Sequence, residues 1–146
     1  MNVLIVEDNV MVAMMLTDEL EHAGHNVIGP FSESTTAIEK GTEANPEFAI
    51  VDLDLADGPT GASVANHLSR KGSCFVLIAS GQLAETEQDY GSARCAIGKP
   101  YDPEDILAIA TGVAEGWPMS HASWPHNITW LETGEDEAGE PSRDEA

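Results

Sequence analysis

Short apolar runs alternate along the chain with stretches whose apolar residues recur at helical spacing. Continuous runs of this length are typical of strands buried on both faces of a parallel sheet. The predicted strands lie at 3–6, 27–30, 48–52, 75–79 and near 93–97. Strands that alternate with helices favour right-handed crossovers. The pattern therefore predicts an α/β protein: a doubly wound, five-stranded parallel sheet with helices on both faces.

Helical spacing predicts five helices between and after these runs. They lie around 12–20, 34–44, 64–68, 83–90 and 103–113, the fourth being the weakest. Gly24 supplies a stop signal after the first helix, and Ser32 or Ser34 is the expected cap of the second. Asp102 is the expected cap of the last helix, with Pro103 at its first position, where proline is favourable. The poorly patterned fourth helix is the candidate mobile element.

Charge narrows the choice of partners. The chain has 146 residues, 42% of them hydrophobic, which is enough for one domain with its own core. Its net charge is −20. Because a polyanionic surface repels phosphates and anionic lipids, we expect no direct binding to nucleic acid or membrane. Cations, and proteins with basic or apolar faces, are the expected partners.

The compartment follows from what the termini and cysteines suggest. Met1 lies two residues before the first apolar run, and no apolar stretch approaches the ~18–20 residues of a membrane helix. A cytoplasmic protein is expected. Cys74 and Cys95 lie in or beside predicted strands, so we interpret them as buried reduced thiols, with a redox pair as the alternative.

Acids, a hydroxyl and a lysine follow the ends of four predicted strands: Glu7 and Asp8, Asp52, Ser80, and Lys99. The carboxyl ends of parallel strands meet at one edge of the sheet, where ligands bind. Asp8 and Asp52 can ligate Mg²⁺ directly, and Glu7 directly or through water. Asp52 is then placed as a nucleophile toward a phosphoryl donor, with Lys99 and Ser80 contacting the phosphoryl oxygens.

Over residues 1 to about 115 the chain resembles a response-regulator receiver domain of two-component signalling. The motifs that carry the resemblance are Val6-Glu7-Asp8, Val51-Asp52-Leu53-Asp54-Leu55, Asp57-Gly58 with Gly61, Ser80-Gly81, and Lys99-Pro100. It implies the flavodoxin-like strand order 2-1-3-4-5. It also implies that a histidine kinase or histidine phosphotransfer protein phosphorylates Asp52, and that Glu7, Asp8, Asp52 and the Asp54 backbone carbonyl surround Mg²⁺. Such a protein is a phosphoacceptor with self-catalysed phosphorylation and dephosphorylation, not an enzyme with turnover.

Several positions depart from the usual receiver pattern or set its details. Ala96 stands three residues before Lys99, where receivers often carry a tyrosine or phenylalanine that moves inward on phosphorylation. Tyr101, after Lys99-Pro100, is a speculative substitute. Ser80 replaces the more usual threonine, and the acceptor loop lacks a common proline. The residues expected to flank the route of attacking water, and so to set phosphoryl lifetime, are Asp54, Gly81 and Gln82.

Composition changes after residue 116. We expect a receiver domain at 1–116 and an acidic, tryptophan-containing tail at 117–146 that is largely disordered. An alternative is that Trp117, Trp124, Trp130 and Leu131 dock on a partner or on the domain itself. No DNA-binding output domain is recognised after residue 116, so we expect signalling by protein contacts, from a monomer or weak homodimer.

The sequence is compatible with two other functions. Asp52 and Asp54 also resemble the first motif of haloacid-dehalogenase-type phosphatases, in which they would be nucleophile and general acid. Those enzymes need a further acidic pair after the lysine, whereas Asp102 and Asp105 here belong to the last predicted helix. A binding-only pseudo-receiver is the second alternative, because the switch aromatic is missing.

Overall fold

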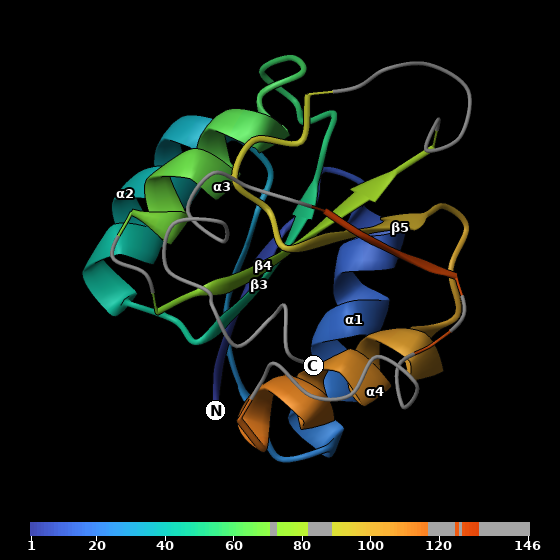
Figure 1. Ribbon diagram of the computed structural model, residues 1–146. Helices are drawn as coiled ribbons and strands as arrows, with labels where there is room; N and C mark the ends of the chain where they lie inside the picture. The colour runs from blue at the N-terminus through green and yellow to red at the C-terminus, as the bar shows by residue number, and fades with distance from the viewer. Residues whose placement is uncertain (71–72, 82–88, 117–124, 126, 132–146) are drawn as a thin grey trace, which may run out of the picture.

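The apolar runs form the strands of one sheet in a computed structural model, which describes residues 1–70, 73–81, 89–116, 125 and 127–131. The strands are β1 (Asn2–Val6), β2 (Asn26–Phe31), β3 (Phe48–Asp52), β4 (Phe75–Ser80), β5 (Cys95–Gly98) and β6 (Ile128–Trp130). Their order is β2-β1-β3-β4-β5-β6, and the first five are parallel (Figure 1). The predicted order 2-1-3-4-5 is therefore confirmed.

Helices cover both faces of the sheet (Figure 1). They are α1 (Val10–His22), α2 (Ser34–Ala44), α3 (Gly61–Ser69) and α4 (Pro103–Ala114). α1 and α4 pack together on one face, and α2 and α3 on the other. The weak helix predicted over 83–90 falls mainly on 82–88, which lie outside the described residues.

Successive residues of the central strands point to opposite faces and enter two separate cores. On β1, Val3 and Ile5 join the core under α1 and α4, whereas Leu4 and Val6 join the core under α2 and α3. β3, β4 and β5 alternate in the same way, and every residue of β3 and β4 is buried. Burial on both faces explains why these strands are continuous apolar runs rather than alternating ones.

The predicted cap of α4 is confirmed, and that of α2 is not. Asp102 caps α4 by accepting a hydrogen bond from the Glu104 amide at 3.2 Å. The prediction that Ser32 or Ser34 caps α2 was wrong: Glu33 is the cap residue, without a side-chain cap bond. Ser34 is instead the first helical residue, and its amide and hydroxyl both donate to the Asp57 carboxylate.

The sheet has one strand more than predicted. β6 is antiparallel to β5 and lies within the segment that we expected to be largely disordered. Trp130 packs edge-on against Phe75, and Leu131 packs against the α2–α3 core, which agrees with docking on the domain itself. Three residues of which only two are apolar carry too weak a pattern to be recognised as a strand. Trp117 and Trp124 lie outside the described residues.

Both cysteines are buried and free, as predicted. Burial raises the pKa of the Cys74 thiol to about 12 and also raises that of Cys95, so neither is a reactive thiolate near neutral pH. Among the described residues, no helix is both long and apolar enough to span a bilayer.

Candidate functional site

Strand register brings the predicted site residues to one edge of the sheet. Val6 pairs with Val51, so that the next residues, Glu7 and Asp52, lie at neighbouring strand ends. Asp52 in turn pairs with Ala79, directly before Ser80. Ser80 pairs with Gly98, directly before Lys99. Each functional side chain is thus positioned by a rigid, buried strand.

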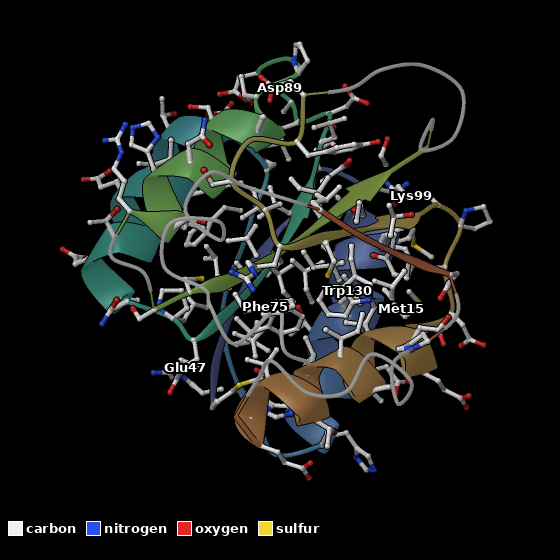
Figure 2. The ribbon with its side chains drawn as sticks, viewed as in Figure 1. Met15, Glu47, Phe75, Asp89, Lys99 and Trp130 are labelled. Atoms are coloured by element: carbon white, nitrogen blue, oxygen red, sulfur yellow. The ribbon has the colours of Figure 1, made fainter. Side chains whose placement is uncertain are left out.

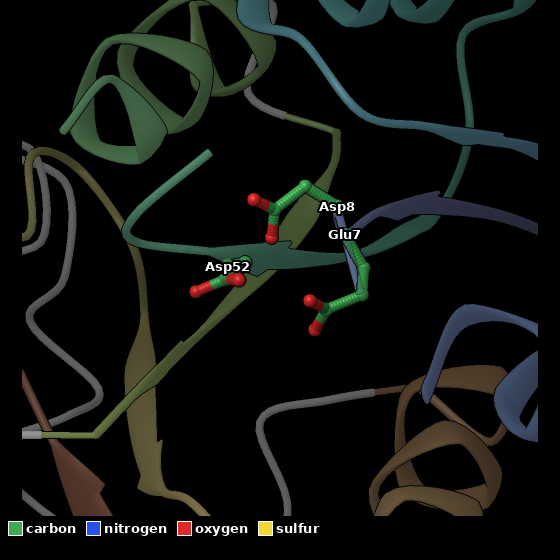
Figure 3. A group of neighbouring side chains, drawn as sticks. All are labelled: Glu7, Asp8 and Asp52. Carbon is green, nitrogen blue, oxygen red and sulfur yellow. The ribbon is translucent and has the colours of Figure 1, made fainter. Parts of the chain in front are cut away.

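Three carboxylates converge at this edge (Figure 3). Glu7, Asp8 and Asp52 each offer an oxygen, and these oxygens all lie within 4.8 Å of one another. Glu7 and Asp52 are only 4% and 5% exposed, whereas Asp8 is open to solvent. Like charges this close repel strongly when desolvated, so the cluster favours a bound cation.

Lys99 bridges the two buried acids. Its Nζ lies 3.2 Å from Asp52 Oδ2 and 3.5 Å from Glu7 Oε1. Its backbone amide donates to the Ser80 carbonyl at 2.9 Å, which holds the base of the side chain against β4. Burial alone would lower the pKa of Lys99, but the charges of Asp52 and Glu7 outweigh it and raise that pKa. Lys99 therefore stays charged beside the carboxylates.

Glu7 is the acid whose ionisation is most disfavoured. Burial raises its pKa to about 7, and the neighbouring Asp52 adds to the shift. The Asn9 amide, which donates to Glu7 Oε2 at 3.0 Å, and the Lys99 charge act in the opposite direction but do not cancel it. Burial is therefore the main reason why ionisation of Glu7 is disfavoured.

The loop after β3 is held close to the acceptor carboxylate. The Asp54 amide donates to Asp52 Oδ1 at 3.2 Å, while the Lys99 ammonium contacts the other oxygen. Gly61 begins α3 directly against this loop: its amide donates to the Leu53 carbonyl at 3.0 Å. A Cβ on Gly61 would collide with the Asp52 carbonyl and lie 2.6 Å from the Leu53 Cα, so the close approach requires glycine.

Asp54, Ser80 and Gly81 lie at or directly after the ends of β3 and β4. Ser80 is buried at the end of β4, and Gly81 is exposed with open space beside it. The Asp54 side chain is exposed. Gln82 lies outside the described residues. The acids that a phosphatase would require are engaged elsewhere, since Asp102 caps α4 and Asp105 accepts a hydrogen bond from Asn127 at 3.0 Å.

Two features of the site were not predicted. Asn9 caps α1 with its side chain while its amide binds Glu7, so that the helix start and the acid cluster share one residue. The Tyr101 hydroxyl is buried and has no hydrogen-bond partner among the described residues. Burial, then the charges of Glu7 and Asp52, raises its pKa. The Asn9 cap could have been recognised from its position before an apolar-periodic stretch.

A parallel sheet in this order, with helices on both faces, defines a flavodoxin-like α/β domain, and an acidic cluster and a lysine lie at its carboxyl edge. Residues 3–111 match the model of the response regulator receiver domain, and the chain belongs to this family. The resemblance that the motifs suggested is thereby confirmed.

Curated relatives and solved structures agree with this assignment. The phyllosphere-induced regulator PhyR of Methylorubrum extorquens is 31% identical over 112 residues, covering 73% of this chain. The chain spans only 41% of the length of that protein. Chemotaxis protein CheY of Thermotoga maritima is 28% identical over 116 residues, covering 77% of this chain and 97% of CheY. A Burkholderia pseudomallei response regulator, described with a phosphorylated aspartic acid, a calcium ion and citrate, is 25% identical with TM-score 0.64, over 78% of this chain and 69% of that one.

Proposed function

We propose that this chain accepts a phosphoryl group on Asp52 from a histidine kinase or phosphotransfer protein and signals through protein contacts. The observation that carries the proposal is the environment of Asp52. Its two carboxylate oxygens contact the Lys99 ammonium and the Asp54 amide, while the oxygens of Glu7 and Asp8 lie within 4.8 Å. The site thus combines a nucleophile held at a strand end, the Lys99 ammonium beside it, and a cluster of three carboxylates.

The acid cluster fits a hard divalent cation such as Mg²⁺. Three carboxylates supply oxygen ligands, and the Lys99 ammonium that contacts Asp52 and Glu7 supplies one positive charge against them. We assign Asp8 and Asp52 as direct ligands, Glu7 as a direct or water-mediated ligand, and the Asp54 carbonyl as a further one. When bound, the cation neutralises charge that develops on the transferred phosphoryl group.

The chain's own residues position and stabilise the transfer. An Asp52 oxygen attacks phosphorus of the donor phosphohistidine; the new O–P bond forms as the N–P bond breaks, and the departing imidazole nitrogen keeps the electron pair. The Lys99 ammonium forms an ion pair with the phosphoryl oxygens, and the Ser80 hydroxyl donates a hydrogen bond to one of them. Since the product is a modified protein rather than a released compound, the chain acts as a phosphoacceptor in the cytoplasm and not as an enzyme with turnover.

An apolar surface beside the site suits a helical donor. Val10, Met11 and Met14 of α1 are 68%, 78% and 58% exposed, directly after the acids of β1 and their neighbour Asn9. Exposed apolar residues clustered on one helix mark interaction surfaces. A donor helix that packs here would bring its phosphohistidine toward Asp52.

Intact mass tests the central assignment. The protein is treated with Mg²⁺ and a small phosphodonor, and compared with Asp52→Asn and with the control Asp18→Asn, at an exposed position of α1. We expect one phosphoryl group on the wild type and on Asp18→Asn, and none on Asp52→Asn. An unmodified wild type, or equal labelling of Asp52→Asn, would refute the proposal.

The lifetime of the phosphoryl group is proposed to depend on Asp54, Gly81 and Gln82. Asp54 and Gly81 are both exposed beside the acceptor, which leaves room for an attacking water. Substituting Asp54 and Gln82 should change the dephosphorylation rate of the isolated phosphoprotein. An unchanged rate would remove these residues from the assignment.

A further inference from the structure

The outer edge of β5 is paired with a short strand from the chain's own C-terminal part, β6. Cys95 pairs with Trp130, and Ile97 with Ile128. The Leu131 amide donates to the Arg94 carbonyl at 3.0 Å and extends the ladder by one residue. Hydrogen-bonded and non-hydrogen-bonded pairs alternate in an antiparallel ladder, so Cys95 and Trp130 form a non-hydrogen-bonded pair, in which side chains lie closest. We call residues 127–131 the edge segment.

Side chains of the edge segment contact both cores of the domain. The Trp130 ring packs edge-on against Phe75, with centroids 6.3 Å apart and planes at 88° (Figure 2). Ile128 also contacts the α1–α4 core, whereas Leu131 contacts the α2–α3 core. Ile128, Trp130 and Leu131 remain only half-buried. The edge segment therefore sits on the domain as an extended peptide ligand sits on a sheet edge.

The edge segment is coupled by position to the phosphoacceptor site. Ile97, which pairs with Ile128, is two residues before Lys99. The Lys99 Nζ contacts Asp52, and the Lys99 amide donates to the Ser80 carbonyl of β4. Because Lys99 directly follows β5, a new charge on Asp52 acts on the carboxyl end of that strand. Ala96, at the usual switch position, has no ring to relay this change, and it pairs directly with Thr129 of the edge segment.

Resting on the proposed function, we infer that the β5 edge is a strand-binding surface controlled by Asp52. The edge segment occupies this surface while Asp52 is unmodified. Phosphorylation moves Lys99 toward the phosphoryl oxygens, weakens the pairing of β5 with β6, and opens the edge to an extended segment of a partner protein. The signal then leaves the site through β5 without an aromatic switch.

The edge segment also indicates the chemistry of that partner. Its Ile128 and Trp130 are two residues apart, so the surface accepts large apolar side chains at alternate positions of an extended peptide. The chain carries a net charge of −20, which favours a partner with basic residues flanking these positions. The same charge disfavours a second copy of this chain as the occupant.

Trp130 fluorescence tests the release. Trp117 and Trp124 are replaced by phenylalanine in the full chain, so that Trp130 is its only tryptophan. After addition of Mg²⁺ and a small phosphodonor, we expect Trp130 emission to shift to longer wavelength, and no shift in the same chain with Asp52→Asn. Intact mass is measured on each sample. Failure to acquire a phosphoryl group refutes the proposed function; acquisition of one with unchanged emission overturns the present inference alone.

A peptide probe tests the opened surface. The probe has the sequence of residues 125–132 with two added lysines at each end, and its control has serine in place of the isoleucine and tryptophan. Fluorescence anisotropy should give about tenfold tighter binding to phosphorylated wild type and to Trp130→Ala than to unmodified wild type or Trp130→Phe. Equal binding to all four overturns the inference. Sedimentation of the phosphoprotein is the second readout, and a dimer that excludes the probe would replace the partner by a second copy of this chain.

Discussion

The acceptor cluster and the edge of β5 hold their side chains by opposite means. At the acceptor cluster, buried charged groups from neighbouring strand ends contact one another, as Lys99 contacts Asp52 and Glu7. At the β5 edge, half-buried apolar groups such as Trp130 pack on a ladder only a few residues long. The energy of a buried charged group changes strongly when any of its partners is altered, whereas a partly exposed strand contributes modestly to the free energy of unfolding. The acceptor cluster is therefore suited to respond to a change of charge on Asp52. The strand β6 is suited to be displaced by that change.

The largest expected effect follows from removing the Lys99 ammonium group from the acceptor cluster. Lys99→Ala deletes the ammonium beside Asp52 Oδ2 and should slow phosphorylation by a small phosphodonor about 100-fold, because one preorganised charge contact is lost. The time course is measured by intact mass. Lys40→Ala, which alters an exposed lysine of α2, is the control and should leave the rate unchanged. Equal rates for Lys99→Ala and wild type would contradict the assigned role.

A smaller effect should come from the backbone that frames the acceptor. Gly61→Ala places a Cβ against the Asp52 carbonyl and the Leu53 Cα, so we expect a loss of about 2 kcal/mol in the free energy of unfolding. Urea denaturation gives this value. Gly81→Ala is the matched control at the same edge, where a Cβ meets open space, and should change stability by less than about 0.5 kcal/mol. Similar losses for both would show that crowding at Gly61 is relieved by movement of the loop.

At the β5 edge the expected change in stability is smaller again. Trp130→Ala removes a half-buried ring that packs against Phe75 and should lower the free energy of unfolding by about 1 kcal/mol. Trp130→Phe keeps an aromatic ring there and should retain most of that stability. The measurement is again urea denaturation of the full chain. A loss as large as that expected for a fully buried ring, about 3 kcal/mol or more, would contradict a displaceable strand.

The last prediction concerns the pH dependence of the cation-free protein. The folded pKa of Glu7, about 7, lies above its ordinary value of 4.5. Stability associated with neutral Glu7 is therefore full below about pH 4.5 and is lost as pH rises through about 7. Glu7→Gln should remove this loss and stabilise the cation-free protein at pH 8, relative to wild type.

Thermal unfolding at several pH values in the presence of a chelator measures the Glu7 effect. Glu21→Gln, at an exposed position of α1, is the control and should leave the profile unchanged. A wild-type profile that stays flat between pH 4.5 and 7 would mean that water or a counter-charge relieves the burial of Glu7.

Sequence patterns predicted those elements whose information is local. The strands β1, β3 and β4 are continuous apolar runs because both of their faces are buried, and this alone identifies them. The cap of α4 was predicted because an Ncap aspartate binds an amide two residues away. The prediction for the cap of α2 was wrong because the Ser34 hydroxyl donates a hydrogen bond to Asp57, 23 residues further on. β6 was missed because its partners, Arg94 and Phe75, lie far away in the chain.

By itself, the sequence determined the parallel sheet and the placement of Glu7, Asp8, Asp52, Ser80 and Lys99 at its carboxyl edge, since strand periodicity and the rules of parallel crossovers suffice for both. Only the tertiary structure decided that Lys99 lies between Glu7 and Asp52, that burial raises the pKa of Glu7, and that β5 is covered by the chain's own β6. These features arise from desolvation and cross-strand contacts. Both depend on which distant residues come together, and residue order along a single strand does not contain that information.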